Sequence, residues 1–504
     1  MRDHKPTKLS KFNGLFDRGD SEEVPRDHFT DCENIRFIGS TGFGTRFGID
    51  QYQDVAVPLG KVVRIYNYIT SEGSTLLVLT YDGTNGKIYH VVDDDTVYGP
   101  ILTIAGMIDF AFVPYAGRAY ISPFASFVQG DLVIEKGMQS QFLYVYLGDG
   151  TTARKAGGTT PAGTLTVANG AAGYTDPGIH LFAVVGETDT GYLSAPIAFK
   201  DFTTAALFSV SFSAVPLFSG TQWVKRHIVA TKKITTYNGN TVGYTYYFIP
   251  GATINNNTAT TLANQSFFDA DLLEDASHLL DNYAEIPAGC GLSIYHNRLC
   301  LNTTYTDISI ILVSTVGEPE AISQIDGLLI VPPDGNPITC TQEMRDVFYT
   351  GKRAKTTAFV DNGDVPSSWP MSVIDLALGF PVHGIATVLD SGGSSVDYLI
   401  TTSFQGIMIF NGKYAQPELS WKISNFWQSL DRTNFRLVSI LNDPITQCIY
   451  ITLPNYKMLT GNYANGLNPK SIRWTPWKFD IKINAIALVN INDLIIAAEG
   501  RLIE

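Results

Sequence analysis

The stretch LLVLTYDGTNGKIYHVV (residues 76–92) decides the fold. It holds an apolar run, a turn of Asp, Gly and Asn residues at Asp82–Gly86, and a second run that begins at Lys87. Turns of this kind between two such runs are typical of β-hairpins, because glycine and asparagine accept the positive φ angles of tight turns. The stretch therefore predicts two antiparallel strands.

The same pattern recurs along the chain, most densely from Gly291 to Glu504, where no segment has a convincing helical period. Tyr398–Ser403 leads into Ile407–Phe410, and Asp493–Ala498 leads into Arg501–Ile503. Strand pairs return about every 45 to 55 residues, a spacing suited to a four-stranded propeller blade. The chain carries no WD or kelch signature, so this rhythm alone predicts an all-β fold built around a β-propeller.

Composition divides the 504 residues into four parts. Residues 1–50 are polar and dotted with glycine, and we expect an extended N-terminal arm in which only Ile35–Ile38 looks like a strand. Residues 51–160 and 283–504 carry the hairpin rhythm and are interpreted as the first and second parts of one propeller. Residues 161–282 have a different spacing, with seven or so short alternating strands, which is typical of a two-sheet β-sandwich.

The sandwich is expected to be an insertion in a blade loop, entered through a Gly, Thr and Pro-rich linker at Ala156–Gly163. Gly191–Pro196, Arg226–Thr231 and Phe267–Asp271 resemble a fibronectin type III-like sandwich. Leu272–Tyr283 is the only plausible short helix. An insertion of this kind is tolerated at an exposed loop and usually adds a binding surface.

Charge and composition exclude several classes of protein. Charged residues make up 16% of the chain, against roughly 25% in an average soluble domain, and the formal net charge is −13. No basic face is expected that would hold nucleic acid by releasing counterions. A wall that lets DNA slide past should repel phosphate, and a net negative charge is compatible with that role.

The N-terminus is basic, but no apolar segment follows it, so we expect no signal peptide. The most apolar stretch, Ile101–Val113, is broken by Asp109 and is shorter than the roughly 20 residues of a membrane helix. An odd number of scattered cysteines implies no disulfide framework and favours folding in a reducing cytoplasm. They are Cys32, Cys290, Cys300, Cys340 and Cys448, of which Cys300 and Cys448 lie in apolar runs and are expected to be buried.

A search for chemistry finds no nucleophilic triad, phosphate-binding loop or dinucleotide fingerprint. No histidine stands at a zinc spacing, and we expect no metal and no cofactor. The isolated histidines are His4, His28, His90, His180, His227, His278, His296 and His383.

Carboxylates are the other candidates, because glycosidases work with two acids about 5 to 9 Å apart. Local pairs occur at Asp93–Asp95, at Glu318 with Glu320, and at Asp361 with Asp364. Catalytic acids usually come from separate strands, so these local pairs do not indicate catalysis, and Asp361–Asp364 is interpreted as a turn. Asp361–Asp364, followed by Trp369, departs from the aspartate box of sialidase propellers at Phe359 and Pro366.

Three further patterns are given structural readings. Asp82–Gly86 and Asp361–Asp364 could offer oxygens to calcium, but both lack the closing Glu of a calcium loop. Arg18–Asp20 spells an adhesion tripeptide, which is expected by chance in a polar arm. Lys352 and Arg353 with Lys355 form a basic turn that we interpret as a solvated face or a subunit contact.

Several segments taken in order resemble a known family. The opening segments are Phe12–Leu15, Val24–Pro25, Asn34–Ile35 and Thr45–Gly48, and the later ones are His296–Leu299, Ser314–Glu320 and Gly406–Gly412. Their order is similar to that of nozzle or tail tubular-type β-propeller structural proteins of short-tailed bacteriophages. The resemblance spans the arm and both propeller parts, and the chain is shorter than many nozzle proteins.

This resemblance implies a homo-oligomeric ring, often a hexamer, in the tail of a virion that is made in the host cytoplasm. The ring would dock under an adaptor ring, carry or contact fibres, and let DNA pass through its axis without specific binding. It implies no catalytic residues and no membrane insertion, so the chain is not expected to be an enzyme. The alternatives are a receptor-binding tail protein and a polysaccharide-degrading one, each built on a propeller.

Overall fold

The structure of the protein is a computed structural model. It describes residues 12–18, 25, 28–29, 31–38, 40, 42–46, 61–71, 73–92, 96–129, 132–158, 161–239, 241, 243–304, 307–353, 355–375, 379–380, 385–389, 397–403, 406–412, 415–416, 418–430, 438–453, 456–489, 493–498 and 501–503. No helix in these ranges is long and apolar enough to cross a membrane.

The first two blades of a propeller precede the sandwich. Blade 1 contains β3 (Lys61–Thr70), β4 (Gly73–Tyr81), β5 (Asn85–Val91) and β6 (Val97–Ala105). Blade 2 contains β7 (Asp109–Tyr115), β8 (Arg118–Gln129), β10 (Tyr144–Tyr146) and β11 (Arg154–Lys155), and β9 (Leu132–Gly137) pairs with β8. The predicted hairpin at residues 76–92 is confirmed as β4 and β5, with Leu79 opposite Ile88.

The other five blades follow the sandwich. Blades 3 and 4 contain β19 (Gly289–Tyr295), β20 (Arg298–Thr304), β21 (Ile310–Val313) and β22 (Leu328–Ile330), then β23 (Ile338–Met344), β24 (Val347–Lys352), β25 (Thr356–Phe359) and β26 (Met371–Asp375). Blades 5 and 6 contain β27 (Ile385–Leu389), β28 (Asp397–Thr402), β29 (Ile407–Phe410) and β30 (Ala415–Gln416), then β31 (Ile440–Asp443), β32 (Cys448–Thr452), β33 (Lys457–Asn462) and β34 (Arg473–Lys478). Blade 7 contains β35 (Ile483–Val489), β36 (Asp493–Ala498) and β37 (Arg501–Ile503).

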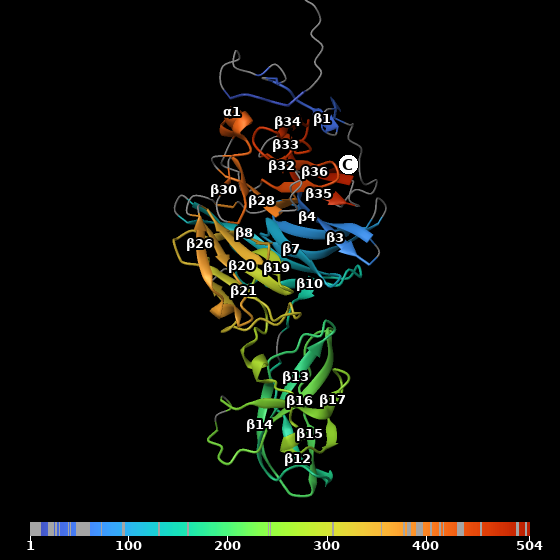
Figure 1. The fold of residues 1–504 in the computed structure, drawn as a ribbon. Helices are drawn as coiled ribbons and strands as arrows, with labels where there is room; N and C mark the ends of the chain where they lie inside the picture. Colours follow the sequence, from blue (N-terminus) through green and yellow to red (C-terminus); the bar gives the residue numbers. More distant parts are fainter. Residues whose placement is uncertain are drawn as a thin grey trace, which may run out of the picture.

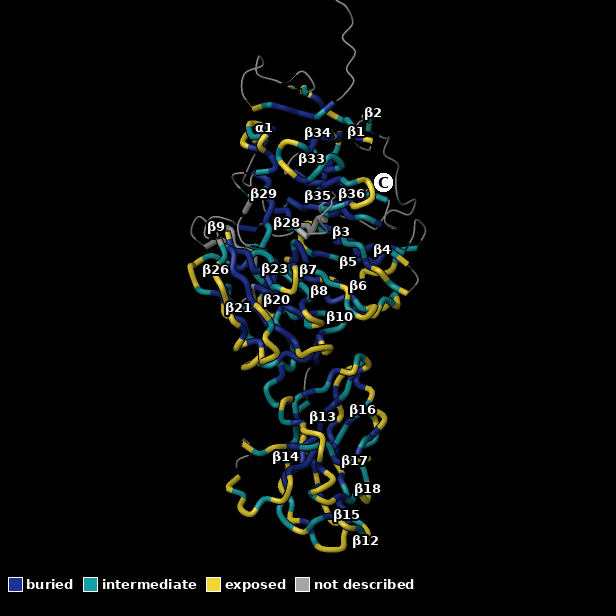
Figure 2. Tube along the Cα trace, in the orientation of Figure 1, coloured by how far each residue is buried: buried dark blue, intermediate teal, exposed yellow. Residues whose placement is uncertain are grey.

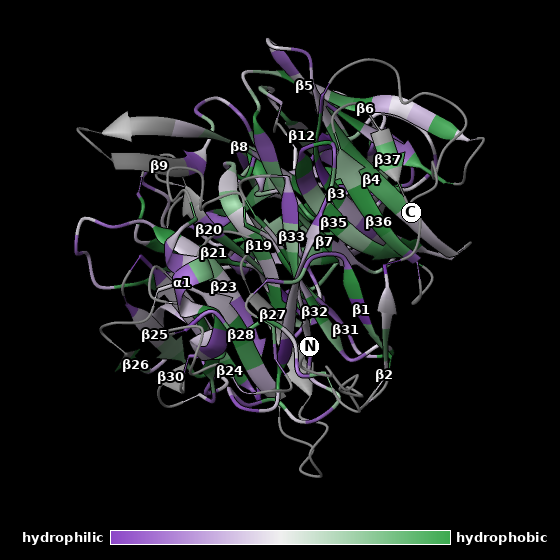
Figure 3. Cartoon of the chain, turned by 90° about the horizontal axis from the view of Figure 1, so that it is seen from above, coloured by the Kyte–Doolittle hydropathy of each residue, from purple (hydrophilic) through white to green (hydrophobic). Residues whose placement is uncertain are grey.

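The inner strands of the seven blades pack against one another in a closed circle. Contacts run from β3 to β7, β19, β23, β27, β31, β35 and back to β3. Within the described residues no strand is shared between the first blade and the last. Apolar side chains of both blades meet there instead, and Figure 3 shows the hydrophobic strands β3, β4, β35 and β36 at this seam.

The inserted domain is a β-sandwich of a three-stranded and a four-stranded sheet. The first sheet has the order β12 (Thr166–Ala172), β15 (Phe208–Ser213), β18 (Leu262–Gln265). The second has the order β14 (Ile197–Thr204), β13 (Gly178–Thr188), β16 (Trp223–Thr231), β17 (Tyr246–Ile254). Alternating apolar residues of both sheets form one core, which includes Phe182, Phe212 and Ile228.

The N-terminal arm lies on the blades of its own chain. Its hairpin of β1 (Ile35–Ile38) and β2 (Gly42–Thr45) lies beside β34, where the Trp477 indole N–H donates to the Ile35 carbonyl at 2.8 Å. Phe12 and Leu15 are buried in the same core as Trp474. Arm, propeller and sandwich follow one another along the long axis of the molecule, so the arm and the sandwich occupy opposite rims of the propeller (Figure 1).

Helices are few, and the predicted helix at Leu272–Tyr283 is wrong in extent and type. That segment holds the 3₁₀ turn η2 (Ser277–Asp281), preceded by η1 (Asp269–Asp271). The four-stranded sheet holds this segment in place, because Ala276 N–H donates to the Tyr246 carbonyl and so competes with helical bonding. The described α-helix, α1 (Ser424–Gln428), follows η4 (Trp421–Ile423) on blade 5, and η3 (Pro366–Ser368) contacts β22.

Candidate functional site

The inner strands of six blades enclose an axial pocket of about 530 Å³. Figure 2 shows buried and intermediate residues along β23 and β35, and mostly such residues along β3 and β7. The pocket is lined from β3, β7, β19, β23, β31 and β35, with both apolar and neutral polar side chains. Its lining includes Tyr66, Phe112, Leu292, Thr341, Gln342 and Ile486. A volume near 530 Å³ is that of a small-molecule site, typically about 300–1,000 Å³.

A buried ion pair crosses one side of this pocket. The guanidinium of Arg64, on β3, donates to both carboxylate oxygens of Asp109, at 3.1 and 2.7 Å. The same guanidinium donates to the Ser439 hydroxyl at 2.6 Å. Only 3% of the Arg64 side chain and 7% of the Asp109 side chain are exposed. This group, the axial staple, ties blades 1 and 2 to the start of blade 6.

The size of the axial pocket and the pairing of its charges limit what the pocket can admit or catalyse. Duplex DNA, whose major groove alone is about 12 Å wide, does not fit a cavity of this size. None of the described residues that line the pocket is a carboxylate, and the Asp109 carboxylate behind it is paired with the lining residue Arg64. Burial raises the pKa of the Cys340 thiol to about 12 and also raises that of the Tyr66 hydroxyl, so neither is an anion near neutral pH.

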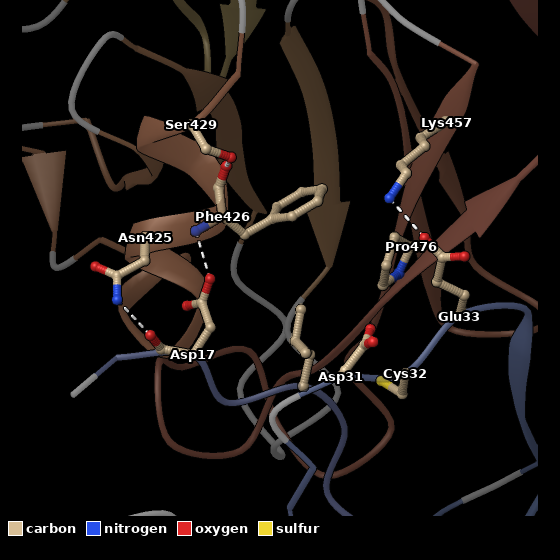
Figure 4. Close-up of a pocket in the computed structure, with 10 residues that line it drawn as sticks. Asp17, Asp31, Cys32, Glu33, Asn425, Phe426, Ser429, Lys457 and Pro476 are labelled. Carbon is tan, nitrogen blue, oxygen red and sulfur yellow. Dashed lines mark hydrogen bonds and ion pairs between the residues drawn. The ribbon is translucent and has the colours of Figure 1, made fainter. Parts of the chain in front are cut away.

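A second hollow, of about 310 Å³, lies between the arm and blades 5 and 6 (Figure 4). The Asp17 carboxylate of the arm accepts a hydrogen bond from the Phe426 N–H of α1, and the Asn425 side chain donates to the Asp17 carbonyl. Burial raises the pKa of the Asp17 carboxyl. Lys457 forms an ion pair with Glu33 at 2.5 Å. These contacts hold the arm on the propeller, and we interpret the hollow as part of that packing.

One group of potential metal ligands occurs in the described ranges. His296, Glu343 and Asp346 place ligand atoms within 4.8 Å of one another on the hairpin turns of blades 3 and 4. Asp361 lies 3.5 Å from the imidazole of His296. Burial raises the pKa of Glu343. Sequence reasoning missed this group, because only the blade-to-blade packing brings the two turns together, and no further feature selects a metal ion.

The local acid pairs of the sequence differ in burial and in hydrogen bonding. Glu318 is exposed, whereas Glu320 is buried at the base of the sandwich. Asp361 and Asp364 form a turn, in which Asp361 accepts from the Gly363 N–H at 2.8 Å and Asn362 donates to Asp364 at 2.9 Å. Residues 93–95, and Gly19 and Asp20 of the tripeptide, lie outside the described residues.

Two other candidates are structural. The Asp82 carboxylate accepts from the N–H groups of Thr84 and Asn85, which closes its turn without an ion. The interpretation of the basic turn as a solvated face is wrong for Lys352. Its ammonium group is buried and lies 3.0 Å from Asp334. The strand register of blade 4 turns this side chain inward, where the Pro332 carbonyl also accepts from it.

His90 and the cysteines have structural surroundings. His90 lies between the Tyr146 hydroxyl at 2.8 Å and the Thr75 hydroxyl at 3.0 Å. Burial lowers the pKa of His90 to about 4. The five cysteines are not joined in disulfides, and Cys300 and Cys448 are buried as predicted.

Comparisons with known proteins add little beyond the topology. No family model matches the sequence, and no curated protein matches it either. Among solved structures, BBS1N in complex with ARL6DN aligns with 91% of this chain and 94% of its own, at 8% identity and a TM-score of 0.36. AztD from Citrobacter koseri aligns over 87% and 89% at 9% identity and 0.32, and Hsv2 from Kluyveromyces lactis over 84% and 98% at 11% and 0.28. Similarities this distant carry no functional argument, and the propeller assignment rests on the circle of blades described above.

Proposed function

We propose that the chain is a structural component of a short-tailed phage tail. In this proposal, copies form a ring, a nozzle or tail tube, through which genomic DNA passes and to which adaptor proteins and fibres dock. The chain would be made in the host cytoplasm and reside in the virion. The resemblance of the arm and propeller segments to nozzle or tail tubular proteins motivates the proposal.

The observation that carries the proposal is that the blades close a circle around an axial pocket too small for duplex DNA. A closed propeller with appendages on opposite rims suits a wall element, because every blade packs on two neighbours and the body is rigid. Copies that contact head to tail close into a ring when the rotation between them allows it. DNA would then pass between copies and not through any single propeller. The net charge of −13 is compatible with a wall that does not retain phosphate.

The staple also bears on the enzymatic alternative. Hydrolysis of a glycosidic bond needs two carboxyl groups, about 5 to 9.5 Å apart. Among the described residues, those that line the axial pocket include no carboxylate, and the nearby Asp109 is already paired with Arg64. A non-catalytic role is therefore the better supported of the two.

Negative-stain electron microscopy of the purified chain, with mass photometry of the same sample, tests the proposal. We expect closed rings with a central hole wide enough for a duplex, formed by the chain alone or after addition of its adaptor ring. A monomer or trimer that stays unassembled in both conditions would overturn the proposal. A trimer would favour a receptor-binding protein, and cleavage of surface polysaccharide would favour the enzyme.

A further inference from the structure

Glu320 gathers donors from three separate parts of the molecule. It lies in the connection between β21 and β22 of blade 3, and only 2% of the residue is exposed. The Thr190 hydroxyl, on the β13–β14 hairpin of the sandwich, donates to one carboxylate oxygen at 2.6 Å. The Gly157 N–H, in the segment that enters the sandwich, donates to the other oxygen at 2.7 Å. Arg154, on blade 2, donates to that second oxygen at 3.2 Å.

The same hairpin is held by further contacts. Arg154 forms an ion pair with Asp189 at 2.6 Å and also donates to the Thr190 hydroxyl at 3.1 Å. Arg118 donates to the Thr190 carbonyl at 3.2 Å. The Tyr192 hydroxyl donates to the carbonyl of Tyr283, in the segment that leaves the sandwich, at 2.9 Å. Two blades and both connecting segments therefore hold one sandwich turn.

The connecting segments are themselves packed. Gly157 pairs with Glu285 in an isolated bridge, and the Gly158 N–H donates to the Ala284 carbonyl. Gly157 has a φ of +75°, and a Cβ there would lie 2.8 Å from the Ala284 carbonyl oxygen. Glycine at this position permits the close approach that brings the 157 N–H to Glu320. The segment that enters the sandwich is therefore packed against the segment that leaves it and is not a loose linker.

Because the carboxylate of Glu320 is buried, its stability depends on its hydrogen-bond partners. A charged group out of water is stable only while it is paired and hydrogen-bonded, and charge-assisted bonds are roughly twice as strong as neutral ones. If the sandwich turned away from the propeller, the Oε1 atom of Glu320 would lose the Thr190 hydroxyl at 2.6 Å and keep the long bond from the Tyr120 hydroxyl at 3.5 Å. The cost of that state opposes any rotation of the sandwich about its two connections.

We propose that Glu320 is the lock that fixes the direction of the sandwich, so that the sandwich is a rigid extension of the propeller and not a tethered module. The lock works by coordinating blade 2, blade 3 and the β13–β14 hairpin through one carboxylate. It follows from intrachain contacts alone, and it stands whether or not the chain forms a ring.

Distance measurement by double electron–electron resonance tests the lock. Spin labels go on Ala206→Cys at the far end of the sandwich and Ser71→Cys on blade 1, two exposed positions, in a Cys340→Ser background. An excess of unlabelled chain removes distances between copies. The parent chain should give one narrow distance distribution, and Glu320→Ala should lose that single narrow peak.

Two further variants make the result decisive. Thr190→Val removes only the hydroxyl that bonds Glu320, keeps the size of the side chain, and should also broaden the distribution. Glu318→Gln changes an exposed neighbour and should leave the peak as it is. A parent distribution as broad as that of the variants would overturn the lock. If Glu320→Ala does not fold, the lock is refuted by a Thr190→Val distribution as narrow as that of the parent.

Discussion

At the scale of single residues, the axial staple is a buried charged contact whose stability depends on both partners. The Arg64 guanidinium and the Asp109 carboxylate are almost fully buried and satisfy each other. Breaking a buried pair by removing one charge costs about 3–5 kcal/mol, because the other charge stays buried without its partner. Replacing both partners by apolar residues of similar volume is often neutral or stabilising.

We therefore expect Asp109→Asn to lower the free energy of unfolding by about 3–5 kcal/mol. Denaturant titration followed by fluorescence measures the change. The double variant Arg64→Met with Asp109→Leu is the control and should recover most of the loss. Equal destabilisation by the single and double variants would show that the staple stabilises through shape and not through charge.

His90 makes the stability of blade 1 depend on pH. Both ring nitrogens are engaged, and burial lowers the pKa of His90 from its ordinary 6.5 to about 4. The unfolded chain then binds the proton more readily than the folded chain between these values. The contribution of His90 is complete above pH 6.5 and is lost as the pH falls towards 4.

Unfolding measured from pH 7.5 to 4 in His90→Gln should accordingly fall less steeply with acidification than in the parent. His278→Gln provides the comparison, because His278 is exposed, and its profile should follow that of the parent. If His90→Gln kept the full slope between pH 6.5 and 4, other groups would be responsible for it.

At the scale of elements, the turn from β14 to β15 carries a residue in an unfavourable conformation. Leu207 has a φ of +65° and is 78% exposed. The left-handed region costs a residue with a Cβ roughly 1–2 kcal/mol, and asparagine tolerates it better. Leu207 makes this turn with little burial to offset the cost.

Leu207→Asn should raise the free energy of unfolding, by roughly 0.5–1 kcal/mol, because it relieves this conformation. Thermal unfolding of the parent and variant measures it. The control is Leu217→Asn, which replaces another leucine, half-exposed and without a positive φ. This variant should not raise the free energy of unfolding. A loss of stability in Leu207→Asn would show that the leucine packs productively despite its exposure.

Elements also show what the sequence could predict. Hairpins such as β4 and β5 were predictable because an Asp–Gly or Asn–Gly turn fixes both strands locally. The role of Glu320 was not predictable. In the sequence Glu320 stands beside Glu318, whereas its proposed role depends on Thr190 and Arg154, which are distant in the chain. The glycines at 157 and 158 were interpreted as a linker. They are glycines because the backbone approaches its neighbours closely, and composition cannot separate these two causes.

At the scale of the whole molecule, spacing predicted a propeller with an inserted sandwich but not seven blades. Blade 7 has three described strands, and connections between blades differ in length, so counting residues per blade does not give the number. The axial staple was also beyond sequence reasoning. Asp109 interrupts an apolar stretch and gives no sign that Arg64 pairs with it and also bonds Ser439.

The seam between blades 1 and 7 has a consequence for synthesis. β3 packs against β35 and β36, although some four hundred positions separate them in the chain. Blade 1 leaves the ribosome early and must wait for blade 7 before its apolar side, which includes Val62, Ile65 and Val78, is covered. Contacts this distant in sequence form slowly, and surfaces exposed meanwhile favour aggregation. The nascent chain therefore depends on protection of blade 1 until β35 and β36 have been made.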